Sequence, residues 1–95
     1  MLRCAVIGLG WAGERHVKAA AELSGRIRIS ALADSDGEFL EERRTELGLA
    51  SIPMHTDYRE VLERDDVDAV SICTPHASHE EIALAAAEAG MHVWC

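Results

Sequence analysis

The stretch that decides the fold is GLGWAG, residues 8–13, which carries glycine at its first, third and sixth positions. A G-x-G-x-x-G spacing is informative only where it closes a strand and opens a helix. The flanking sequence meets both conditions. Residues 2–8, LRCAVIG, are apolar and rich in strand formers, and residues 11–23, WAGERHVKAAAEL, favour a helix. The stretch is therefore expected to form the turn between a first strand and a first helix.

In such a turn each glycine has its own physical task. Gly8 allows the tight turn, Gly10 lets the main chain approach a pyrophosphate, and Gly13 lets the helix press against the strand. The free N–H groups and the dipole of the helix start favour a phosphate, the dipole by about 0.3–1 kcal/mol. The alternative is a glycine-rich turn without a ligand. The candidate cofactor contacts of this turn are Gly8, Leu9, Gly10, Trp11, Ala12 and Gly13.

Outside the turn, short strand-like runs alternate with helix-like segments. This alternation predicts an α/β fold, a Rossmann-type doubly wound parallel sheet of about five strands. The whole chain, residues 1–95, is then one dinucleotide-binding domain. The expected strands are residues 2–8, 26–34, 51–56, 68–73 and 92–95, and the expected helices are residues 11–23, 35–47, 57–64 and 79–89.

Two serines stand three residues before a glutamate at expected helix starts. Ser35 with Glu38, and Ser78 with Glu81, match a capping box, in which the two residues satisfy each other's main-chain N–H groups. We expect both serines to be N-caps. The aromatic residues Tyr58 and Trp94 are expected in the core.

Asp34 follows the second expected strand, 21 residues after Gly13. That spacing is typical of the acid that holds the adenosine ribose of a dinucleotide. A carboxylate there repels the extra phosphate of NADP, and neither Ser35 nor Asp36 is a cation that would attract it. The pattern favours NAD over NADP, with Asp34 and Ser35 as candidate contacts. A plain turn residue is the alternative for Asp34.

The segment CTPHASH, residues 73–79, follows the fourth expected strand. Ligands of open α/β sheets bind at the carboxyl ends of the strands, where the strand order reverses, so this segment should lie beside the nicotinamide. His79 is either a cofactor or substrate contact or a surface histidine at a helix start. His76 and His79 have no third ligand nearby, so no metal site is expected. The candidate cofactor contacts are Cys73, Thr74, Pro75 and His79.

Composition restricts the class of partner. The formal net charge of −8 argues against nucleic acid, and no apolar run approaches the length of a membrane span. The N-terminus does not read as a signal peptide. Three cysteines lie far apart and are expected to be reduced, as in a cytoplasmic protein.

Three runs together resemble the glucose–fructose oxidoreductase, inositol dehydrogenase and MocA (Gfo/Idh/MocA) family. They are AVIGLGWAGERHVKAA (5–20), LADSD (32–36) and DAVSICTPHASHEEIALAAAEAGMHVWC (68–95). The resemblance implies an NAD(P)-dependent oxidoreductase acting on sugars, polyols and related hydroxyl or carbonyl compounds. It implies the same cofactor sites: the three glycines, Asp34, and the segment with Thr74, Pro75 and His79. A non-catalytic dinucleotide sensor, or a Rossmann domain for S-adenosylmethionine or coenzyme A, are the alternatives.

In that family the run resembling GMHVWC continues into a Glu-Lys-Pro motif, whose lysine supports proton transfer, and a second domain completes the substrate pocket. Both are expected to be absent here, so this chain alone is expected to be inactive. No catalytic residue is assigned, and His76, His79 and His92 are not substitutes. An uncovered sheet edge predicts marginal stability, or pairing with another chain or with the missing remainder, and a homo-oligomer is expected.

Overall fold

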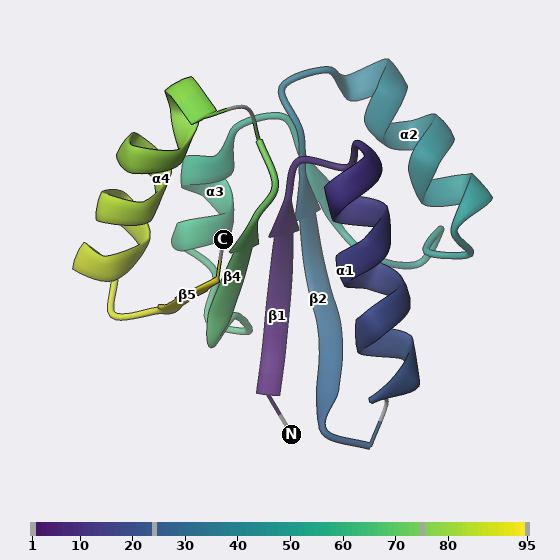
Figure 1. Cartoon of the computed structure of the whole chain (residues 1–95), viewed down its shortest axis with the longest axis horizontal. Coiled ribbons are helices and arrows are strands. Elements are labelled where there is room, and N and C mark those ends of the chain that lie inside the picture. The colour runs from purple at the N-terminus through teal and green to yellow at the C-terminus, as the bar shows by residue number, and fades with distance from the viewer. Residues whose placement is uncertain (1, 24, 75, 95) are drawn as a thin grey trace.

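The structure, a computed structural model, describes residues 2–23, 25–74 and 76–94, apart from the side chains of Trp11 and residues 76–78. Strands and helices alternate along this part of the chain, as the sequence predicted (Figure 1). The strands are β1 (Leu2–Ile7), β2 (Ile27–Ala33), β3 (Met54–His55), β4 (Ala69–Ile72) and β5 (His92–Trp94). The helices are α1 (Trp11–Glu22), α2 (Gly37–Glu46), α3 (Tyr58–Leu62) and α4 (His76–Glu88).

The strands form one parallel sheet in the order β3-β2-β1-β4-β5. From β1 the chain first builds outward through β2 and β3, then crosses over to β4 and β5 on the other side. The strand order therefore reverses between β1 and β4. Because all strands are parallel, their carboxyl ends meet at one edge, uppermost in Figure 1. The Rossmann-type doubly wound sheet is confirmed.

Helices cover both faces of the sheet. Side chains of β1 alternate between two clusters: Cys4 and Val6 pack with α1 and α2, and Ala5 and Ile7 pack with α3 and α4. All four are buried. Burial on both faces explains why these strands are almost continuously apolar, and each fully buried aliphatic side chain contributes roughly 1.5–3 kcal/mol.

A bulge in β2 keeps both faces apolar. Cys4 pairs with Ile29 but Ala5 pairs with Ala31, so Ser30 is an extra residue without a partner on β1. The inserted residue reverses the alternation, and Ile29 joins the α1–α2 cluster although Ala31 joins the other. Without the bulge, one end of β2 would direct its side chains to the wrong face.

The two predicted capping boxes are wrong. Asp36, not Ser35, is the N-cap of α2, and its carboxylate accepts a hydrogen bond from the Phe39 N–H at 3.1 Å. An aspartate caps as well as a serine, so the spacing alone could not decide between adjacent residues. Helix α4 begins at His76, which leaves Ser78 inside its first turn. Trp94 is also not a core residue, since it is 40% exposed.

Candidate cofactor-binding site

A cleft of about 840 Å³ opens at the carboxyl ends of β1, β2, β3 and β4. Its size is within the range of roughly 300–1,000 Å³ that is usual for small-molecule and cofactor sites. The cleft lies at the point where the strand order reverses, which is where open α/β sheets bind ligands. Its lining residues are Ile7, Gly8, Gly10, Ala33, Asp34, Ser35, Phe39, Thr56, Asp57, Tyr58, Cys73, Thr74, Glu81 and Ile82.

Two glycines of the first turn are required by the protein itself. Gly8 has φ of +92°, and a Cβ there would lie 2.9 Å from the main-chain carbon and oxygen of Cys73. A Cβ at Gly13 would overlap the main-chain oxygen of Gly8. The ends of β1 and β4 thus approach each other at Gly8, and α1 packs directly on the turn at Gly13.

Gly10 differs from the other two glycines of the turn, Gly8 and Gly13. Its φ of −70° suits any residue, and no atom lies within 4 Å of where its Cβ would be. Gly10 lines the cleft and is the N-cap of α1, and no side chain caps this helix. By contrast, Asp36 and Asp57 cap α2 and α3. The first N–H groups of a helix have no partners within the helix, so the start of α1 offers donors next to the cleft.

Asp34 links the end of β2 to the glycine turn. One carboxylate oxygen accepts the Leu9 N–H at 3.1 Å, and the other accepts the Asp36 N–H at 3.0 Å. The residue is half-buried and lines the cleft. A carboxylate has about four acceptor positions, so these two hydrogen bonds orient the group and leave capacity for a ligand.

Leu9 contributes to the site differently from its neighbours in the turn. Its side chain is fully buried, its N–H donates to Asp34, and its carbonyl accepts a hydrogen bond from Arg43. It therefore has no donor left for a phosphate and supports the turn from beneath. Ala12 is half-buried in the first turn of α1, whereas the side chain of Trp11 lies outside the described residues.

The segment after β4 reaches the same cleft through Cys73 and Thr74. The hydroxyl oxygen of Thr74 is buried and has no hydrogen-bond partner among the described residues. A buried hydroxyl without a partner is costly, which fits a group that pairs with a ligand. His79 is half-buried in the first turn of α4, so it is not a fully exposed surface histidine. Pro75 and the side chain of His76 lie outside the described residues.

Sequence reasoning missed one wall of the cleft. Thr56, Asp57 and Tyr58 follow β3, and the Tyr58 hydroxyl donates a hydrogen bond to Glu81 of α4 at 3.1 Å. Burial, followed by this carboxylate, raises the pKa of Tyr58. The sequence did contain a signal for this wall, because residues 56–58 stand at the carboxyl end of the third expected strand. Tyr58 is partly buried against the core, as expected, but also lines the site.

The cleft wall is acidic. Asp34, Asp57 and Glu81 line it, and among its described lining residues there is no lysine or arginine. An anionic ligand therefore depends on main-chain N–H groups and the α1 dipole rather than on a side-chain cation. The described residues contain no cluster of three or more metal-ligating side chains and no helix long and apolar enough to cross a bilayer.

Residues 2–95 match the family described as "Oxidoreductase family, NAD-binding Rossmann fold", GFO_IDH_MocA. The chain belongs to this family. The match extends over the glycine turn, Asp34 and the segment after β4, so it includes every part of the cleft. The family resemblance seen in the sequence is confirmed.

Known relatives cover the same part of the fold. Inositol 2-dehydrogenase of Streptomyces avermitilis is 35% identical over 95 residues, which are all of this chain and 27% of the relative. A glycosyl hydrolase family 109 protein of Shewanella pealeana is 35% identical over an alignment of 100 residues. The alignment covers 98% of this chain and 22% of the relative. The chain thus spans about a quarter of the length of the relatives that it matches.

A solved structure of levoglucosan dehydrogenase in complex with NADH has a TM-score of 0.87 against this chain at 30% identity. The match covers 97% of this chain and 26% of the solved one. The fold that positions the cleft is therefore shared with an enzyme solved with a nicotinamide cofactor.

Proposed function

We propose that this chain is the NAD-binding part of an oxidoreductase that transfers hydride between nicotinamide and a sugar, a polyol or a related hydroxyl or carbonyl compound. The observation that carries the proposal is the convergence of two features on one cleft. The start of α1, at Gly10, has no side-chain cap. The carboxylate of Asp34, which retains unused acceptor positions, lines the same cleft. The family match and the NADH complex of levoglucosan dehydrogenase support it.

In this proposal the start of α1 binds the diphosphate through main-chain N–H groups. Gly10 is glycine because the ligand, rather than the protein, occupies the space beside it. Asp34 accepts hydrogen bonds from the adenosine ribose, with Ser35 beside it. Cys73, Thr74 and His79 lie toward the nicotinamide end, where the sequence also predicts Pro75, a residue outside the described part of the chain. The bound cofactor supplies the hydride chemistry, and these residues orient it.

The acidic wall favours NAD over NADP. A 2′-phosphate on the ribose would stand next to Asp34, and Asp57 also lines the cleft. No lysine or arginine among the described lining residues would compensate for that repulsion. NADH should therefore bind more tightly than NADPH.

We further propose that residues 1–95 work together with a substrate domain, because the relatives are about four times longer than the matched region. On this proposal the catalytic groups lie outside this chain, and the chain alone binds the cofactor without turning over substrate.

A cytoplasmic homo-oligomer is part of the same proposal. β5 is a sheet edge within the described residues, and the exposed Trp94 and Leu23 support association. Sedimentation equilibrium of the chain tests whether it forms a homo-oligomer.

A second candidate activity comes from the glycosyl hydrolase family 109 relative, which is as similar to this chain as the inositol dehydrogenase. A protein with that activity would bind its cofactor in the same cleft and would act on a glycoside. A third candidate is a cofactor sensor without catalysis. Assays of the full-length protein with polyols and with glycosides separate these activities, since only a dehydrogenase accumulates NADH.

The first experiment is a titration of NADH and NADPH into the chain, followed by quenching of the tryptophan emission of Trp11 and Trp94. We expect saturable quenching, with NADH preferred. A folded chain that binds neither nucleotide would refute the proposed function. Binding of S-adenosylmethionine or coenzyme A instead would reassign the ligand.

A further inference from the structure

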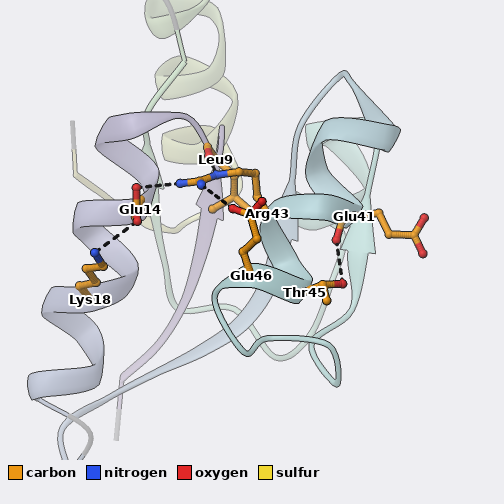
Figure 2. Close-up of polar contacts among 7 residues, drawn as sticks. All are labelled: Leu9, Glu14, Lys18, Glu41, Arg43, Thr45 and Glu46. Atoms are coloured by element: carbon orange, nitrogen blue, oxygen red, sulfur yellow. Dashed lines mark hydrogen bonds and ion pairs between the residues drawn. The ribbon is translucent and has the colours of Figure 1, made fainter.

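Arg43, in the middle of α2, connects three elements behind the glycine turn (Figure 2). Its Nε donates a hydrogen bond to the Leu9 carbonyl at 3.1 Å, and Nη2 donates to Glu14 of α1 at 2.8 Å. Nη1 donates to Glu46, one turn further along α2, at 2.9 Å. The Arg43 side chain is only 18% exposed. Its guanidinium is therefore held in place, directed away from solvent and toward the turn.

The Leu9 peptide is held from both sides. Asp34 accepts its N–H and Arg43 donates to its carbonyl. The peptides on either side of Leu9 belong to Gly8 and Gly10, and glycine main chain is the most easily rotated. The two contacts on Leu9 thus add side-chain restraints to a turn in which main-chain hydrogen bonds also hold Gly8, whose N–H donates to the Ala33 carbonyl at 2.7 Å. Rotation of this turn would redirect the N–H groups at the start of α1.

An arginine fits this position better than a lysine does. The guanidinium is a planar group with five N–H donors, so it can reach three acceptors on three elements at once. A lysine ammonium at the same place could keep its charge near Glu14 but could not reproduce the planar set of hydrogen bonds. The position therefore separates charge from geometry.

We infer that Arg43 is a positioning residue for the diphosphate of the cofactor, acting through the Leu9 carbonyl and the glycine turn. The inference deepens the proposed function and rests on it. Arg43 does not line the cleft, so it would act on the cofactor only through the turn. Its effect is to fix the orientation of the turn before the cofactor arrives, so that less ordering is required on binding.

Arg43 also balances the negative charge of Glu14 by forming an ion pair with it. The Arg43 and Lys18 side chains lower the pKa of Glu14, so its carboxylate is charged in the first turn of α1. A bare carboxylate there would compete with a phosphate for the positive end of the helix. The variants below are chosen to distinguish this charge effect from the hydrogen bond to Leu9.

The test compares Arg43→Lys with Glu14→Gln in the 95-residue chain. Arg43→Lys keeps the charge and loses the planar contact with Leu9. Glu14→Gln removes the ion pair and leaves the contact with Leu9. Affinities for NADH, ADP and adenosine are measured by amide NMR titration, which reports millimolar binding, and unfolding is measured in urea. Both variants remove one interaction of the same cluster, so both are expected to lose some stability.

If Arg43 positions the turn, Arg43→Lys should weaken NADH and ADP about tenfold, the effect of losing one charge-assisted hydrogen bond, and leave adenosine unchanged. Glu14→Gln should bind all three like the wild type. Equal ADP affinity in Arg43→Lys and wild type would overturn the inference, as would equal losses for ADP and adenosine. A wild-type chain that binds neither NADH nor ADP would instead refute the proposed function itself.

Discussion

Two aspartates at opposite ends of the sheet show how the protein treats charge. Asp68, just before β4, is neutralised within the molecule by Arg3 of β1. The Arg3 side chain donates from Nε at 3.0 Å and from Nη2 at 2.9 Å, and its main-chain N–H donates at 2.9 Å. These bonds hold the pKa of Asp68 well below its usual range.

Asp34, just after β2, accepts main-chain N–H groups only, one on each oxygen. No arginine or lysine among the described residues forms an ion pair with it. Its charge is oriented but not neutralised, and it faces a cleft. The difference separates an aspartate that stabilises the fold from one that is available to a ligand. Substitutions at the two ends should therefore affect stability and binding separately.

The largest effect is expected where fold and site coincide, at Gly13. Gly13→Ala places a Cβ onto the Gly8 carbonyl oxygen, which must move. Overpacking of this kind costs about 1–3 kcal/mol, and the displaced turn should lose measurable NADH binding. Urea unfolding and the tryptophan-quenching titration measure the two losses. Wild-type stability together with wild-type binding would show that the turn adapts to a side chain.

At the binding end, Asp34→Asn should weaken NADH about 10- to 100-fold, because a charge-assisted hydrogen bond contributes about 1.5–3 kcal/mol. The preference for NADH over NADPH should shrink, since the repulsive charge is gone. Asp68→Asn is the matched control, as it removes the same charge from the other end of the sheet. Equal NADH affinities for the two variants would contradict the division between the two aspartates.

Gly10→Ala probes the start of α1 alone. Nothing in the protein meets a Cβ at this position, so the cost should stay below about 1 kcal/mol, the difference between glycine and alanine as an N-cap. NADH affinity should fall by about tenfold, because the methyl group occupies the space left for the diphosphate. Unchanged affinity would mean that the ligand does not approach the main chain at Gly10.

The sequence predicted the fold, and it singled out several residues that line the candidate cleft, because both depend on local signals. Strand runs, glycine spacing and Asp34 are readable along the chain, and parallel strands bring their carboxyl ends together. The Arg43 contact with Leu9 could not be predicted, because 34 residues separate them and many exposed arginines look alike. The Tyr58–Glu81 wall required knowing that α3 packs against α4. The caps failed because adjacent serine and aspartate offer equivalent oxygens.

The smallest effect belongs to the structural aspartate. The Arg3–Asp68 pair is about one-third exposed, so solvent screens it, and Asp68→Asn should lower stability modestly at pH 7 without changing NADH binding. The pH dependence carries the sharper information. Because the folded state lowers the pKa of Asp68, the contribution of the pair is fully present above the unfolded-state pKa of about 4. It is lost as pH falls through the folded-state value.

Protonated Asp68 resembles asparagine in charge, so the two chains should converge as the carboxyl group titrates. Urea unfolding of wild type and Asp68→Asn at pH 7, 5, 3 and 2 tests this. The stability difference should be constant between about pH 7 and pH 5 and then shrink steadily below about pH 4. A difference that persists unchanged at the lowest pH would mean that the asparagine disturbs packing at the start of β4. The contrast with Asp34 would then rest on shape rather than on charge.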